Sequence, residues 1–217
     1  MKLYLYDHCP FCVRADMVAN YKQVAHEKVY LLNDDEKSCF DLIGAKMVPI
    51  LQFDDGKAMG ESLDIVQKLD ELGSRNRPLQ PGTDIQALLA QIGEVGLAVS
   101  CLLFPRNIAI GLPEFATQSA RDYFEVRKAA IIKRPFAQAL KETPTHKAAI
   151  ENMLAALPPL PAAAGRDGVL GRDDVLLYPT LRNLTMVKDL VIPAQVRAYI
   201  DSVAALTSTH TYFDRAI

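Results

Sequence analysis

The chain of 217 residues has no tryptophan, only four cysteines and a formal net charge of −2. The near-neutral charge argues against nucleic acid as an obligate partner, because nucleic-acid-binding domains usually carry a basic surface. A chain of this length can bury a sizeable core, so the fold does not need disulfide bonds. Half of the residues are hydrophobic and 23% are charged, which is the composition of a soluble globular protein.

We expect no secretory signal, and the sequence contains no long uninterrupted apolar run. The apolar start of the chain is broken at Asp7, too early for a signal peptide. The most apolar stretch, residues 85–104, contains two glutamines and Glu94, and its bulky apolar residues have the spacing of one buried helical face. We therefore expect a cytoplasmic protein with no membrane partner, and a core helix in this stretch.

The first third of the chain alternates between β and α patterns. Strands are predicted over Lys2–Tyr6, His26–Leu32, Val48–Phe53 and Lys57–Met59, and helices over Pro10–Tyr21, Glu36–Gly44 and Glu61–Leu72. A strand, a helix and a strand within about thirty residues form a βαβ unit with parallel strands. The Asp55-Gly56 turn folds the last strand back antiparallel. The pattern predicts an α/β domain of thioredoxin-like type with a mixed four-stranded sheet.

The second part of the chain shows only helical patterns. Residues 74–84 are polar and rich in proline and glycine, which indicates a linker between a domain at 1–73 and an all-α C-terminal domain at 85–217. Prolines, the first of them Pro105, punctuate the helical segments. The proline-rich stretch 157–164 is predicted to be a loop, and the helix Asp173–Lys188 to be the spine of this domain.

Two of the cysteines are close together in the stretch DHCPFC. If Pro10 is the first residue of the helix, Cys9 lies at its N-terminus and Cys12 lies one turn further along. Unpaired backbone N–H groups and the helix dipole favour a thiolate there, so the pKa of Cys9 should fall from about 8.5 into a range of roughly 3.5–7.5. We expect Cys9 to attack disulfides and the protonated Cys12 to resolve the product.

Other uses of these thiols fit the sequence less well. A zinc site needs about four ligands, and Cys39 and Cys101 do not form a second closely spaced pair. A structural disulfide is unusual in a cytosolic chain. The C-x-x-C spacing beside a βαβ pattern is typical of a thioredoxin-like redox site. Cys39 and Cys101 are expected to be buried small side chains without a role, and His8 and Arg14 to be solvated surface residues.

Two further motifs suggest a site for a peptide-like thiol. Val48-Pro49 opens the third strand, and a cis bond there would leave the backbone of Val48 free to pair with an extended ligand. Ser62, at the start of the following helix, either caps that helix or binds a carboxylate with the help of its N–H groups. Glu61 is placed to bind an ammonium group. Glutathione offers both charges on its γ-glutamyl end.

The motifs Cys9-Pro10-Phe11-Cys12, Val48-Pro49 and Glu61-Ser62, followed by a helical second half, resemble the glutaredoxin 2 family. Members of that family combine a glutaredoxin domain with the two-domain architecture of glutathione S-transferases. The resemblance implies a cytoplasmic, monomeric, glutathione-dependent thiol–disulfide oxidoreductase without a metal, acting on disulfide-bearing or glutathionylated proteins. It implies Cys9 as nucleophile, Cys12 as resolving thiol and Val48-Pro49, Glu61 and Ser62 as glutathione contacts.

The sequence departs from the family pattern at two positions. Phe11 stands where tyrosine is common, which removes a hydroxyl group beside the thiols. Gly171 stands where the transferase fold usually has a serine or threonine that caps a core helix, three residues before Asp174. Because glycine has no side-chain acceptor, the capping box is expected to be incomplete.

Three alternatives stay open at this point. A cysteine-type glutathione transferase or dehydroascorbate reductase resembles this architecture, but it needs only one thiol. A non-catalytic interaction module would leave the C-P-F-C pair unused. An iron–sulfur cluster shared through Cys9 and glutathione in a dimer has no positive support in the sequence. The residue that binds the glycine carboxylate of glutathione is not identified by any motif, and Lys46 is one candidate.

Overall fold

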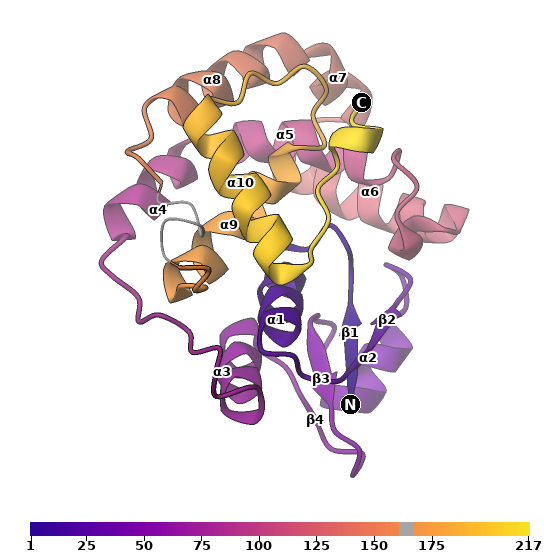
Figure 1. Ribbon diagram of the computed structural model, residues 1–217. Helices are drawn as coiled ribbons and strands as arrows, with labels where there is room; N and C mark the ends of the chain where they lie inside the picture. The colour runs from indigo at the N-terminus through magenta and orange to yellow at the C-terminus, as the bar shows by residue number, and fades with distance from the viewer. Residues whose placement is uncertain (161–166) are drawn as a thin grey trace.

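A computed structural model gives the fold of residues 1–160 and 167–217. The N-terminal part is a sheet flanked by helices, and the helical C-terminal part lies against it (Figure 1). The elements of the N-terminal part are β1 (Lys2–Leu5), α1 (Pro10–Tyr21), β2 (Glu27–Tyr30), α2 (Glu36–Ile43), β3 (Ile50–Gln52), β4 (Ala58–Met59) and α3 (Ser62–Leu72). The predicted order of strands and helices is present.

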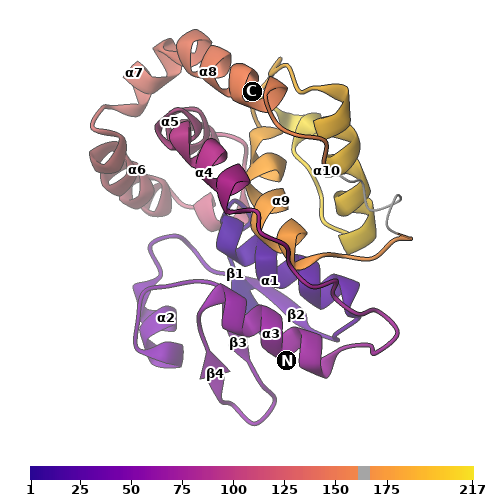
Figure 2. The same ribbon diagram turned by 90° about the vertical axis from the view of Figure 1, so that its left-hand side faces the viewer.

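The sheet has the strand order β2-β1-β3-β4. Strand β1 pairs parallel with β2 and antiparallel with β3, and β3 pairs antiparallel with β4. Leu3 pairs with Leu51 in the ladder, and both side chains are buried. Helices α1 and α3 pack side by side on one face, whereas α2 contacts β3 and β4 (Figure 2). The predicted mixed four-stranded sheet is therefore confirmed.

Most of the predicted elements in this part differ from the structure by one or two residues at an end, and the differences at Val48 and Glu61 concern predicted ligand contacts. The third strand begins at Ile50 rather than Val48, because proline has no N–H group to donate to the ladder. The Val48-Pro49 bond is cis. Helix α3 begins at Ser62, so Glu61 rather than Ser62 occupies the N-cap position. No side chain caps this helix end among the described residues.

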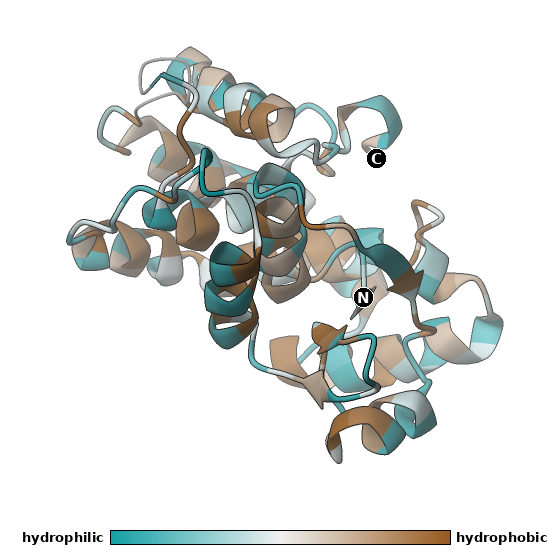
Figure 3. Ribbon diagram, turned by 60° about the horizontal axis from the view of Figure 1, so that its bottom comes forward, coloured by the Kyte–Doolittle hydropathy of each residue, from teal (hydrophilic) through white to brown (hydrophobic). Residues whose placement is uncertain are grey.

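The elements of the C-terminal part are α4 (Gln86–Glu94), α5 (Gly96–Asn107), η1 (Pro113–Phe115), α6 (Gln118–Ile132), α7 (Phe136–Lys141), α8 (Thr143–Ala155), α9 (Arg172–Leu184), α10 (Ala194–Thr207) and η3 (Phe213–Arg215). Hydrophobic and hydrophilic residues are mixed along the helical ribbons of the molecule (Figure 3). The predicted helical character is confirmed.

The predicted single helix over residues 85–104 is two helices. The chain bends by 64° between α4 and α5. Glycines at positions 93 and 96 flank the bend, and glycine weakens a helix because it loses much backbone entropy on folding. Within residues 1–160 and 167–217, no single helix is long and apolar enough to cross a membrane, and α4 and α5 pass such a test only as this bent pair.

Two predictions about helix ends in this part are wrong, one at Pro105 and one at Thr185. Pro105 does not interrupt a helix, because α5 runs through it to Asn107. The spine helix α9 ends at Leu184 rather than Lys188. The Thr185 hydroxyl donates to the Arg182 carbonyl at 2.6 Å and accepts from the Tyr212 N–H at 2.8 Å, so the chain leaves the helix there. Of the predicted loop 157–164, residues 161–164 lie outside the described residues.

Helix α9 lies at the centre of the C-terminal part and packs on α1, α5 and α10. Gly171 is its N-cap, and the Asp174 side chain accepts from the Gly171 N–H at 2.7 Å. Glycine supplies no side-chain acceptor in return, so only half of a capping box is made, as predicted.

One apolar cluster runs from Leu3 in the sheet to Leu102 in α5 without a break. The division into domains at residues 73 and 85 stays a prediction.

Candidate active site

The C-P-F-C motif lies where β1 gives way to α1. Cys9 is the N-cap of α1 with an extended backbone, Pro10 is the first helical residue, and the Val13 N–H donates to the Cys9 carbonyl at 3.0 Å. The Cys9 side chain is half-buried and Cys12 is buried. The Tyr6 N–H, at the end of the strand, donates to Cys12 Sγ at 3.4 Å. The geometry at the helix start is the one the sequence predicts.

The two thiols have opposite acid–base character. A hydrogen bond from the Cys12 thiol is the largest effect on Cys9, and it outweighs burial and brings the pKa of Cys9 to about 7. The charge of His8 and the N–H groups of Cys12 and Phe11 lower it further. Burial, followed by the neighbouring Cys9, raises the pKa of Cys12. Cys9 is therefore about half ionised at neutral pH, while Cys12 keeps its proton.

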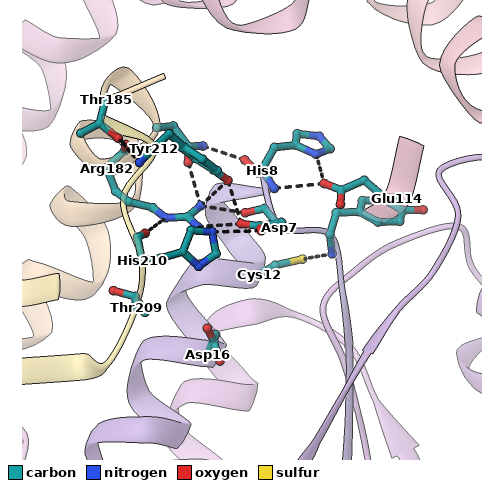
Figure 4. Close-up of polar contacts among 12 residues, drawn as sticks. Asp7, His8, Cys12, Asp16, Glu114, Arg182, Thr185, Thr209, His210 and Tyr212 are labelled. Atoms are coloured by element: carbon teal, nitrogen blue, oxygen red, sulfur yellow. Dashed lines mark hydrogen bonds and ion pairs between the residues drawn. The ribbon is translucent and has the colours of Figure 1, made fainter. Parts of the chain in front are cut away.

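His8, the residue before Cys9, was predicted to be a solvated surface residue, but it is buried. Its ring lies against Tyr6 and Phe124, and its Nδ1 is 2.5 Å from Glu114 Oε1. The His8 N–H donates to the same oxygen at 3.1 Å (Figure 4). Glu114 has 0% of its surface exposed, and its Oε2 has no hydrogen-bond partner among the described residues. A carboxylate from the helical part therefore orients the imidazole beside Cys9.

Asp7, at the start of the motif, is held by a second buried network. Its carboxylate accepts from Arg182 and from the Tyr212 hydroxyl, and it lies 3.0 Å from Nε2 of His210 (Figure 4). Asn183 adds a bond from its side-chain amide to the His8 carbonyl at 2.6 Å. The loop before Cys9 is thus fixed to helix α9 and to the C-terminal segment.

Two adjoining cavities lie in front of Cys9. The larger, of about 390 Å³, is lined by Cys9, His8, Tyr6 and Asn33 together with Lys46 and Lys128. The smaller, of about 240 Å³, is lined by Pro49, Glu61 and Ser62. Phe11, Met47 and Val48 line both. The predicted glutathione contacts therefore lie together in the smaller cavity, which shares three lining residues with the cavity of Cys9; the two cavities together are called the groove.

The backbone of Val48 is available to a ligand in this groove. The ladder between β1 and β3 begins at Ile50, and no other described residue makes a backbone hydrogen bond to Val48. Glu61 has a φ of +62°, a conformation rare for residues with a side chain and common at ligand sites. The roles of Val48, Pro49, Glu61 and Ser62 in binding stay predictions.

Arg14 is half-buried rather than solvated. Its guanidinium carbon lies 4.8 Å from the centre of the Phe11 ring, and its Nη1 is 3.4 Å from Ser62 Oγ. Its Nε is buried and has no hydrogen-bond partner in the described parts of the chain. Ser62 is therefore not a helix cap, and a positive charge stands beside it.

Lys46 lies in the larger cavity, but two of its hydrogen bonds are already made. Its Nζ donates to the Tyr6 hydroxyl at 2.8 Å and to the Asp35 carbonyl at 3.0 Å. The sequence interpretation missed Lys128 and Glu114, which come from α6 and η1 in the helical part. No motif marks them, because only the packing of the two parts brings them to Cys9.

A larger cavity, of about 490 Å³, lies far from the thiols between the linker, α4 and α9. Two of its lining residues are joined by a hydrogen bond, in which the Thr83 hydroxyl donates to the Asp173 carboxylate at 2.7 Å. In residues 1–160 and 167–217, no group of three or more His, Cys, Asp or Glu side chains is arranged to hold a metal ion.

Comparison with known proteins decides the family. Residues 84–216 match the family model "Glutaredoxin 2, C terminal domain", and residues 3–77 match "Glutathione S-transferase, N-terminal domain". The chain is 38% identical to Glutaredoxin 2 of Escherichia coli K12 over 220 aligned positions, which cover 100% of both chains. The chain belongs to the glutaredoxin 2 family.

Solved structures give the same result. Glutaredoxin 2 from Salmonella typhimurium, determined in complex with glutathione, is 38% identical, has a TM-score of 0.89 and is matched over 98% of its length and 100% of this chain. Maleylacetoacetate isomerase from Methylobacterium extorquens AM1, at 19% identity, has a TM-score of 0.56 with 96% of this chain and 94% of that chain covered. It shows the fold alone. The predicted family and the transferase-like two-domain architecture are confirmed.

Proposed function

We propose that the chain is a dithiol glutaredoxin in which Cys9 is the nucleophile and Cys12 the resolving thiol. As a member of the glutaredoxin 2 family, it is an enzyme, a glutathione-dependent thiol–disulfide oxidoreductase. The observation that supports the dithiol mechanism is the pair of opposite pKa shifts. Cys9 has a pKa of about 7 at the mouth of the cavity, and the buried Cys12 thiol that donates to it has a raised pKa.

The first step is attack on a glutathione mixed disulfide. The Cys9 thiolate attacks the sulfur of glutathione, the S–S bond of the substrate breaks, and the protein thiolate leaves and takes up a proton. A second glutathione thiolate then attacks the glutathione sulfur of the Cys9 adduct. Oxidised glutathione leaves, and the Cys9 thiolate is restored.

With a protein disulfide, Cys9 forms a mixed disulfide with the substrate. Cys12 loses its proton, its thiolate attacks Cys9 Sγ, and the second substrate thiol is released. The Cys9–Cys12 disulfide is then reduced by two glutathione molecules. Because the two thiols are already adjacent, the attack of Cys12 on Cys9 requires little rearrangement.

Glutathione binding is proposed to follow the groove. The Val48 backbone pairs with the cysteinyl residue, as in the addition of a strand to a sheet edge. The N–H groups at the start of α3, with Ser62, receive the γ-glutamyl carboxylate, and Glu61 receives the ammonium. Arg14 beside Ser62 favours the negative charge of that carboxylate.

The cellular setting is also a proposal. All four cysteines are free thiols in the structure, which suits a reducing compartment such as the cytoplasm. We propose disulfide-bearing and glutathionylated proteins as substrates and a monomeric enzyme. The molar mass measured by light scattering during gel filtration tests whether the enzyme is a monomer.

The test is glutathione-coupled reduction of a small mixed disulfide, run beside conjugation of glutathione to an electrophilic aromatic chloride. We expect strong reduction, negligible conjugation and complete loss of reduction in Cys9→Ser. Cys12→Ser should keep reduction of the mixed disulfide and lose most reduction of protein disulfides. Conjugation or dehydroascorbate turnover without disulfide reduction would instead support a cysteine-type transferase.

A further inference from the structure

Lys128 lies in the cavity of Cys9 and has no carboxylate partner among the described residues. It lies on α6, is half-buried, and lines the cavity of about 390 Å³ together with Cys9. Its Nζ lies 5.2 Å from the centre of the Phe104 ring and 5.6 Å from that of Phe124. Within the described parts of the chain, no oxygen accepts a hydrogen bond from this ammonium and no carboxylate pairs with it.

The surroundings of Lys128 favour an anionic ligand. An ammonium group has three donors, and ring faces offset only part of the loss of hydration. Burial lowers the pKa of Lys128, while the nearby Cys9 thiolate raises it. Lys46 in the same cavity differs, because the Tyr6 hydroxyl and the Asp35 carbonyl already accept from it. Of the two lysines in this cavity, Lys128 is therefore the one whose ammonium makes no hydrogen bond to residues 1–160 or 167–217.

The course of the groove indicates which anion reaches Lys128. Glu61 and Ser62 line only the smaller cavity, Lys128 lines only the larger, and Val48 lines both. A glutathione molecule with its γ-glutamyl end at Ser62 and its sulfur at Cys9 has one charged group left, the glycine carboxylate. That group extends past Val48 into the larger cavity.

We propose that Lys128 forms the subsite for the glycine carboxylate of glutathione. The C-terminal part then completes the glutathione site of the N-terminal part. This inference rests on the proposed function. Lys128 is a binding residue in this role, and the chemistry at sulfur stays with Cys9 and Cys12. A charge-assisted hydrogen bond of this kind changes kcat/KM by about tenfold.

The test compares two mixed disulfides of 2-mercaptoethanol, one with glutathione and one with glutathione amidated at glycine. The wild type is expected to prefer the free carboxylate by about tenfold in kcat/KM. Lys128→Gln should lose this preference and react with both at the rate of the amide, whereas Lys128→Arg should keep most of it. Arg127→Gln, which removes a neighbouring charge that pairs with Glu36 outside the cavity, should keep the full preference.

Three results would overturn the inference while leaving the glutaredoxin function intact. The first is a wild type that cleaves both disulfides equally well, which needs no variant to be folded. The second is an unchanged preference in Lys128→Gln, or its loss in Lys46→Gln alone. The third is an equal fall for both disulfides in Lys128→Gln, with an upward shift in the pH midpoint of Cys9 alkylation. A wild type that cleaves neither disulfide would overturn the proposed function and this inference with it.

Discussion

Asp7 and Arg182 form a buried ion pair, with 2.6 Å between Oδ1 and Nη2, although 175 residues separate them along the chain. Arg182 Nη1 also donates to the Asp7 carbonyl at 2.8 Å. The Tyr212 hydroxyl donates to the same carboxylate oxygen at 2.7 Å. The C-terminal part therefore holds the loop that leads to Cys9.

Removal of Arg182 should destabilise the protein strongly. Arg182→Met leaves the Asp7 carboxylate buried without its main cation, which lowers the free energy of unfolding by about 3–5 kcal/mol. Urea unfolding monitored by circular dichroism measures the change. Arg197→Met, which removes an exposed pair with Asp201, should cost no more than about 1 kcal/mol. The double variant Asp7→Asn/Arg182→Met should recover part of the loss, and equal losses in the two single arginine variants would contradict the role of the network.

The Asp7–Arg182 ion pair should lose part of its stabilising effect in acid. Burial by itself raises the pKa of Asp7, but the hydrogen bond with His210 and the charge of Arg182 hold it well below its usual range. Since the folded-state pKa is depressed, the pair stabilises the fold above the unfolded-state pKa of about 3.9 and loses this effect as the pH falls toward the folded-state value.

The measurement is the difference in unfolding free energy between the wild type and Asp7→Asn from pH 7 to pH 3. The difference should be constant near neutrality and narrow below about pH 5. The comparison with Asp7→Asn cancels the contributions of other carboxylates. A difference that stays constant down to pH 3 would rule out Asp7 as the titrating group.

The ionisation of Cys9 should depend on Cys12. In the wild type, alkylation of Cys9 by iodoacetamide is expected to rise with pH around a midpoint of about 7. Cys12→Ala removes the thiol hydrogen bond that lowers the pKa most, so the midpoint should move toward the ordinary thiol value of about 8.5. Cys101→Ala, at a buried cysteine on α5, serves as the control and should leave the midpoint in place. An unshifted midpoint in Cys12→Ala would mean that the helix N-terminus and His8 alone stabilise the thiolate.

Glu114 should be needed for the packing of His8. Glu114→Ala leaves two buried donors of His8, the backbone N–H and Nδ1–H, without their acceptor. We expect a loss of about 3 kcal/mol in unfolding free energy, measured by urea denaturation. Glu94→Ala, at an exposed position on α4, should change it by less than about 0.5 kcal/mol. If both variants lose equally little, the Glu114 carboxylate is not a significant anchor.

Much of the N-terminal part could be predicted because its signals are local. Alternating apolar residues mark the strands, and Pro10 after Cys9 marks the start of α1. The errors fall where local signals compete. Residues 85–104 have the apolar spacing of one helix, but the two glycines at the bend allow the chain to turn at Val95. Pro105 signals a break, yet α5 accommodates it near its C-terminal end.

The sequence by itself determined the family, the order of strands and helices in the redox part and the position of the two thiols, since these depend on residues close together in the chain. Only the tertiary structure decided what surrounds those thiols. His8 and Arg14 have polar side chains of the kind usually found on the surface. In the fold, however, η1 packs against His8 and α3 against Arg14, so that neither is fully solvated. Asp7 meets Arg182, and Lys128 reaches the cavity of Cys9, because α9 and α6 fold back over the redox part. Contacts of this kind join distant segments, and no periodicity or spacing within either segment encodes them.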